Sequence, residues 1–68
     1  MEHLAVHHAD GVAAEVYSEF IKGARRYRVI FRDLESDCII DSRTYPDRAS
    51  AVAWADRVTN AVGGTVTR

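Results

Sequence analysis

One segment of the chain is bounded at both ends by residues that interrupt a helix. Pro46 is the only proline, and Gly63-Gly64 is the only adjacent glycine pair. A proline disfavours helical backbone at the residue before it, and a glycine commonly follows the last helical turn. Asp47 is placed to accept hydrogen bonds from the free N–H groups of a first turn. We therefore predict a helix over residues 47–62, closed at Gly63.

The predicted helix is amphipathic. Its apolar residues recur mostly at spacings of three and four along one side, and its polar residues fall mainly on the other. The apolar side consists of Ala51, Val52, Trp54, Ala55, Val58 and Val62. We assign this side to the core, and we interpret Trp54 as a packing residue before a binding residue.

Two segments upstream of the helix have the pattern of β-strands. Residues 26–33 alternate between polar and apolar side chains apart from Ile30, and residues 38–45 are rich in β-forming types. The polar residues 33–37 between them suit a hairpin loop. The apolar face of the first strand is Tyr27, Val29 and Phe31. We predict an antiparallel pair with this face packed under the helix.

Residues 12–21 fit two secondary structures. As a strand, the segment would have the apolar face Val12, Ala14, Val16 and Phe20. As a helix, it would carry an apolar stripe between Asp10 as cap and Gly23 as stop. A third strand widens the sheet that the helix must cover, so we favour the strand. The fold class is α+β: a three-stranded antiparallel β-meander packed on one C-terminal helix (β-β-β-α), with α-β-β-α as the alternative.

Length and composition bound the organisation of the chain. Its 68 residues, 47% hydrophobic and 28% charged, are typical of one small folded domain with a thin core. We expect a flexible, histidine-rich lead-in at residues 1–11, a single domain at 12–62 and a tail at 63–68. The single cysteine allows no internal disulfide, and no apolar run approaches the ~20 residues of a membrane span. We expect no signal peptide and a cytoplasmic location.

The lead-in contains the residues that most resemble metal ligands. His3, His7 and His8 lie close to Asp10 in the sequence. A zinc site usually needs four ligands on a fixed scaffold, which a flexible terminus does not supply. We interpret these histidines as water-facing residues and expect no metal.

We also expect no enzymatic activity and no cofactor. The sequence shows no glycine-rich phosphate loop, Ser/His/Asp set or Cys-x-x-Cys pair. Cys38 would need a histidine base beside it to act as a nucleophile, so we interpret it as a packed thiol at the start of a strand. Asp33, Glu35 and Asp37 share an exposed loop, where nothing would desolvate one of them for general acid chemistry.

Arginine gives the strongest functional signal. All but one of the 9 basic residues are arginine, and Arg25, Arg26, Arg28 and Arg32 lie on or beside one predicted strand. An outer sheet face that also carried Tyr17, Arg43 and Tyr45 would interleave guanidinium groups with aromatic rings, as nucleic-acid-binding surfaces do. At a formal net charge of −1 we favour a simpler interpretation, in which Glu15, Glu19 and Asp41 pair with these arginines across the sheet.

Several segments resemble short strand-strand-strand-helix proteins of phages and mobile elements, among them some anti-CRISPR proteins. The segments are Glu15-Val-Tyr-Ser-Glu-Phe, Arg26-Tyr-Arg-Val-Ile-Phe-Arg-Asp, a Glu-Ser turn, Ile39-Ile40, Tyr45-Pro-Asp and Ala51-Val-Ala-Trp-Ala. The resemblance covers about residues 12–62, is one of architecture and transfers no functional residue. It implies an inhibitor that binds a CRISPR surveillance complex or its nuclease and blocks DNA binding or nuclease recruitment.

We therefore predict a small non-enzymatic interaction protein, encoded by a phage or mobile element, that binds a larger host protein or protein complex. Arginine and tyrosine are enriched at binding hot spots, and Ile21 and Ile30 would give the outer sheet face an apolar centre. The predicted partner-binding residues are Tyr17, Arg26, Arg28, Ile30, Arg32, Arg43 and Tyr45. The alternative is a nucleic-acid-binding module that uses the same arginine-rich face. A homodimer is compatible with either function.

Overall fold

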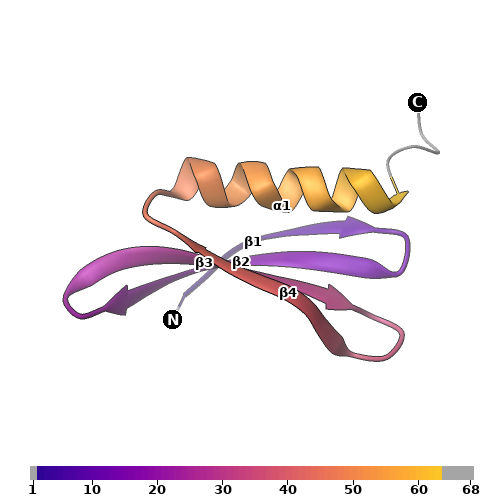
Figure 1. Cartoon of the computed structure of the whole chain (residues 1–68), viewed down its shortest axis with the longest axis horizontal. Helices are drawn as coiled ribbons and strands as arrows, with labels where there is room; N and C mark the ends of the chain where they lie inside the picture. The colour runs from indigo at the N-terminus through magenta and orange to yellow at the C-terminus, as the bar shows by residue number, and fades with distance from the viewer. Residues whose placement is uncertain (1, 64–68) are drawn as a thin grey trace.

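The computed structural model describes residues 2–63 and shows four antiparallel strands followed by one helix (Figure 1). The elements are β1 (Glu2–Ala9), β2 (Val12–Ile21), β3 (Ala24–Asp33), β4 (Cys38–Tyr45) and α1 (Arg48–Gly63). The strands form one sheet in the order β1-β2-β3-β4, so every strand pairs with its neighbour in the chain. The α+β class and the C-terminal helix are confirmed, but the predicted three-stranded meander is one strand short.

The additional strand, β1, lies in the segment predicted as a flexible lead-in. It pairs with β2 from Glu2 opposite Ser18 to Ala9 opposite Val12. Small and aliphatic residues lie on the side of β1 that faces α1. There Leu4, Ala5 and Ala9 pack against the core. The prediction for residues 1–11 is therefore corrected for residues 2–9, where the histidines masked a strand pattern.

The ambiguous segment, residues 12–21, is strand β2. Val12, Ala14 and Val16 are buried on the helix-facing side, as the strand interpretation predicts, but Phe20, the fourth residue of the predicted apolar face, is 67% exposed. The turn that follows fits a strand, because Lys22 and Gly23 both have positive φ, of 54° and 80°. That geometry belongs to the two-residue hairpin turns that join antiparallel strands.

The core lies between α1 and one face of the sheet. Val16 and Val29 are fully buried at the centre of the sheet, opposite each other in β2 and β3. Phe31 of β3 meets Trp54 of α1 edge to face, with ring centroids 6.4 Å apart. The predicted packing of the β3 apolar face under the helix and of Trp54 in the core is confirmed; the side chain of Val62 lies outside the described residues.

The start of α1 follows the capping chemistry that the sequence predicts. Asp47 accepts a hydrogen bond from the backbone N–H of Ser50 at 2.8 Å, and a second from the Ser50 hydroxyl at 3.0 Å. The helix includes Gly63, one residue beyond the predicted end at residue 62. The rest of the predicted tail, residues 64–68, lies outside the described residues. Within the described part of the chain, no helix has the length and hydropathy that crossing a membrane requires.

The two edge strands are both irregular. In β1 the register shifts between His3 and Ala5, and at β4 it shifts so that Ile40 has no partner in β3. Every residue of β4 except Tyr45 is exposed, because this strand extends beyond the cover of α1. Cys38 is exposed at its start. The prediction of a packed Cys38 thiol is therefore wrong.

Candidate interaction face

The face of the sheet opposite α1 has no element packed on it among residues 2–63 (Figure 1). Alternation along the strands and the pairing between them assign side chains to this outer face. The outer face includes His3, Val6, Glu15, Tyr17, Glu19, Ile21, Arg26, Arg28, Ile30, Arg32, Ile39, Ser42 and Thr44. Five of the predicted partner-binding residues therefore come together on one surface: Tyr17, Arg26, Arg28, Ile30 and Arg32.

The first ionic contact on the outer face joins β2 to β3. The Nε and Nη2 atoms of Arg28 both lie 3.0 Å from one carboxylate oxygen of Glu19. Nη1 of Arg28 lies 3.4 Å from the hydroxyl of Ser42 on β4. Arg28 thus bridges three strands. The Glu19 side chain is only 14% exposed, so this pair is better shielded from water than a typical surface pair.

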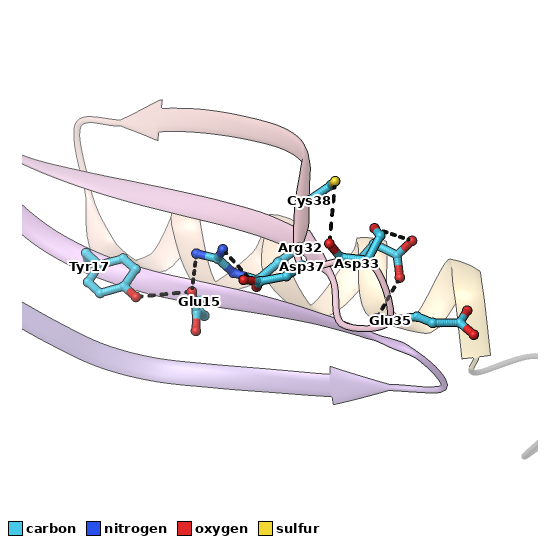
Figure 2. Close-up of polar contacts among 8 residues, drawn as sticks. Glu15, Tyr17, Arg32, Asp33, Glu35, Asp37 and Cys38 are labelled. Carbon is cyan, nitrogen blue, oxygen red and sulfur yellow. Dashed lines mark hydrogen bonds and ion pairs between the residues drawn. The ribbon is translucent and has the colours of Figure 1, made fainter.

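The second ionic contact centres on Glu15 (Figure 2). The Tyr17 hydroxyl donates a hydrogen bond of 3.1 Å to Glu15, and Nη2 of Arg32 lies 3.5 Å from the same oxygen. Nη1 of Arg32 lies 3.4 Å from Asp37 in the β3–β4 turn. Burial and the Glu15 hydrogen bond and charge raise the pKa of Tyr17 above its usual 10.0, with a smaller opposing effect from Arg32.

These contacts compensate the charges of two arginines of β3, Arg28 and Arg32. The predicted pairing of Glu15 and Glu19 with arginines of the neighbouring strand is confirmed, but Asp41 pairs with Arg43 of its own strand and not across the sheet. Arg26 lies opposite Glu19 in the register, but it forms no ion pair within the described part of the chain. A phosphate backbone would have to compete with these carboxylates for Arg28 and Arg32. The face is therefore better matched to a mixed polar and apolar surface than to a polyanion.

Arg43 and Tyr45 lie on the other face of the sheet. They are opposite Val29 and Tyr27, two residues that face the helix. The guanidinium carbon of Arg43 is 4.8 Å from the centroid of the Trp54 ring, and Tyr45 packs against the same ring at 6.5 Å. The expectation that these two residues share the outer face is wrong, because cross-strand partners point to the same side of a sheet.

Apolar side chains lie among the paired charges. Val6 is 41% exposed, and Ile30 is partly buried between Arg28 and Arg32 along β3, whereas Ile21, 37% exposed, lies at the end of β2, away from the predicted apolar centre at Ile30. Ile30 is also opposite Glu15 in the register. The outer face therefore has an apolar centre surrounded by two ion pairs.

Sequence reasoning missed the contribution of β1 to this face. The ring of His3 packs against Tyr17 with centroids 5.1 Å apart. His7 faces the other way, with Nδ1 4.0 Å from Asp56 on α1. Among the described residues, no three His, Cys, Asp or Glu side chains are arranged to hold a metal ion. The dipeptide Asp10-Gly11, a common hairpin turn, was the signal that could have identified β1.

Comparison of the chain with protein-family models, curated proteins and solved structures finds no match. The function has to be inferred from the residues and geometry of this chain.

Proposed function

We propose that this protein is a non-enzymatic interaction module that binds another protein through its outer face. The observation that carries the proposal is the arrangement around Ile30. A partly buried isoleucine lies beside Glu15–Arg32 and Arg28–Glu19, whose charges are already compensated. Protein interfaces combine such an apolar centre with a polar rim.

Preorganisation strengthens this proposal. Arg28 is held by Glu19 and Ser42, and Tyr17 is held by Glu15 and by the ring of His3. Side chains that are already ordered lose less conformational entropy on binding, so more of the contact energy remains as affinity. Arg26 adds a guanidinium for a bidentate contact with a carboxylate of the partner.

In its specific form, the proposal is a small inhibitor from a phage or mobile element that binds a larger host complex and blocks DNA binding or nuclease recruitment. This form is supported by the resemblance of residues 12–62 to anti-CRISPR proteins of the strand-strand-strand-helix type. The exposed outer face supplies the surface that such an inhibitor needs. Arg43 and Tyr45 are left out of the proposed interface because they contact Trp54.

The test begins with capture of partners by the immobilised protein from a nuclease-treated lysate of a bacterium that carries a CRISPR system. The captured complex is then purified, and its affinity is measured for the unmodified protein and for Ile30→Asp. We expect a loss of at least about tenfold, equivalent to about 1.4 kcal/mol, because a carboxylate would be buried at the apolar centre. Circular dichroism establishes that each variant is folded.

Ala53→Asp is the matched control, since Ala53 is exposed on α1, on the other layer of the molecule. It introduces the same charge and should leave the affinity unchanged. If Ile30→Asp unfolds the domain, Tyr17→Ala and Arg26→Ala test the same face with smaller changes. Unchanged affinity in folded variants of the outer face contradicts the assignment. Capture of nucleic acid alone, lost on nuclease treatment, supports the nucleic-acid-binding alternative instead.

A further inference from the structure

The charges of the chain are separated along its long axis. The β2–β3 turn lies at one end of the sheet, and the β1–β2 and β3–β4 turns lie at the other (Figure 1). We define the basic tip as Phe20, Ile21, Lys22 and Arg25, and the acidic end as Asp33, Leu34, Glu35, Asp37, Ile39 and Ile40. No acidic residue occurs between Glu19 and Asp33 in the sequence. Although the formal net charge of the chain is only −1, the basic tip carries positive charge and the acidic end carries negative charge.

The basic tip presents an ordered aromatic side chain. Phe20 is 67% exposed, the most exposed large apolar residue among those described. The guanidinium carbon of Arg25 lies 4.7 Å from the centroid of its ring. Ile21, beside it, is 37% exposed. The basic tip thus combines the exposed apolar side chain of Phe20 with cationic groups, and the cation–π contact with Arg25 restrains the Phe20 ring.

The acidic end presents the complementary chemistry. Leu34, Ile39 and Ile40 are each about half exposed, at 47%, 56% and 54%. The Asp37 side chain is 82% exposed beside them, so it remains open to a cation of another copy although it already lies 3.4 Å from Nη1 of Arg32.

The β3–β4 turn, which carries Leu34 and Asp37, is held by hydrogen bonds. The N–H of Leu34 donates a 2.9 Å hydrogen bond to the carbonyl of Gly11, which ties the turn to the β1–β2 turn. Asp33 accepts bonds from the backbone N–H of Glu35 at 3.1 Å and from the Ser36 hydroxyl at 3.2 Å (Figure 2). The acidic end is therefore a fixed apolar patch bordered by carboxylates.

From this complementarity we propose that the basic tip of one copy of the protein docks on the acidic end of a second copy. Phe20 packs against Leu34, Ile39 and Ile40 of the other copy, while Lys22 and Arg25 meet its Glu35 and Asp37. Both partner surfaces are exposed in a single chain and lie at opposite ends of it. The contact is heterologous, so it propagates into a chain of copies unless the rotation between them closes a ring.

A second copy fits the tip better than a lipid surface does. Inserting Phe20 into hydrocarbon would carry the Arg25 guanidinium with it, at a large cost in desolvation. Docking on the acidic end gives that guanidinium a carboxylate partner. The strand edges are a poor alternative route to self-association, because β1 and β4 both have an interrupted register.

The contact is weak because its area is small. The Cα positions span only 25 Å and 15 Å in the two shorter directions, so an end-on contact is smaller than the ~800 Å² per partner of a standard interface. We expect association only at high protein concentration and low salt. Docking at the ends leaves Tyr17, Arg28 and Ile30 free in the middle of the outer face, and only Ile21 and Ile39, at its two ends, belong to both surfaces. This inference therefore goes beyond the proposed function and does not depend on it.

The first measurement is sedimentation velocity of the unmodified protein over a concentration series. We expect the average mass to rise with concentration and to fall when salt increases from about 0.1 M to about 1 M, which shortens the Debye length from about 10 Å to about 3 Å. Mass that stays at that of one chain at every concentration and salt overturns the proposal. Binding of such a monomer to anionic phospholipid vesicles through Phe20 would show that the tip serves a membrane instead.

The second measurement uses variants that each disable one end. Phe20→Ser with Arg25→Glu removes the tip, and Asp37→Lys with Ile39→Ser removes the acidic end. Each variant alone should associate at least about tenfold more weakly than the unmodified protein. An equal mixture should form dimers and nothing larger, because only one productive contact remains. Association of a mixture that is no stronger than that of either variant alone overturns the proposal.

Arg57→Glu is the matched control for charge reversal, since Arg57 is exposed on α1. It should leave association unchanged. Ile30→Asp separates this inference from the proposed function, because it alters the outer face and not the ends. If Ile30→Asp abolishes self-association while the tip variant does not, the copies meet through the outer face and the proposed end-to-end contact is wrong.

Discussion

Arg43 lies over the Trp54 ring, with its guanidinium carbon 4.8 Å from the ring centroid. Asp41, two residues earlier on β4, holds the same guanidinium from the side, with Oδ2 3.5 Å from Nε. Tyr45 packs on the same ring from the end of the strand. Since the rest of β4 is exposed, these contacts attach the edge strand to α1.

Replacing Arg43 with alanine should therefore loosen the edge strand. We expect Arg43→Ala to lower the free energy of unfolding by about 0.5–1 kcal/mol, the contribution of an exposed cation–π contact. Chemical denaturation followed by the fluorescence of Trp54, the only tryptophan, measures it. Arg57→Ala, on the exposed side of α1, is the control and should have no effect. Equal stability of the two variants would show that the Trp54 contact contributes nothing.

The centre of the core should be sensitive to lost volume. Val16 is fully buried opposite Val29 and under α1. We expect Val16→Ala to lower the free energy of unfolding by about 2 kcal/mol, from lost burial and the remaining cavity. Val6→Ala, at a 41% exposed position of the outer face, should cost far less. Similar denaturation midpoints for the two variants would contradict the placement of the core.

The β2–β3 turn offers a stabilising substitution. Lys22 has a φ of 54°, which an L side chain adopts at a cost and asparagine tolerates better. Lys22→Asn should raise the free energy of unfolding by about 0.5–1 kcal/mol, whereas Lys22→Gln, which also loses the charge, should not. Gly23→Ala should lower it by about 1–2 kcal/mol through backbone strain alone, because no atom lies within 4 Å of the added Cβ. Thermal melts of the three variants test the turn type.

The raised pKa of Tyr17 predicts a loss of stability in strong base. The folded state holds the phenolic proton more tightly than the unfolded state does, so the stabilisation is complete below pH 10.0 and is lost as pH rises through the folded pKa. The pKa of Tyr17 is obtained from the difference between the absorbance pH titrations of the unmodified protein and of Tyr17→Phe. Glu15→Gln should lower the pKa of Tyr17, because it removes the carboxylate charge beside the hydroxyl. A Tyr17 pKa that Glu15→Gln leaves unchanged would contradict the role of that contact.

The elements with strong local signals could be predicted from the sequence. Asp47 and Gly63 mark the ends of the helix to within one residue, and the alternation from Tyr27 to Phe31 placed one face of β3 in the core. The polarity of the histidines hid β1, because an edge strand needs apolar residues on only one side, and that side here carries two small alanines and a histidine beside Leu4.

The candidate site was predictable in part. Tyr17, Arg28 and Arg32 share the outer face because they alternate with buried residues on their strands. Arg43 and Tyr45 could not be placed from alternation, since β4 is exposed on both sides and its faces differ little in polarity. Only the pairing with β3 assigns them to the helix side. Cys38 was misplaced for the same reason.

The unpaired position of Ile40 makes β4 unusually sensitive to a change in length. Successive side chains of a regular strand point to opposite faces, so loss of one residue normally exchanges the two faces beyond the gap. At Ile40 the chain already carries one residue more than regular alternation requires. Deleting it would leave the core residues untouched and make the outermost strand regular. Such an edge is a template for strand addition between molecules, so a single deletion would convert a self-limiting sheet into one prone to fibrillar growth.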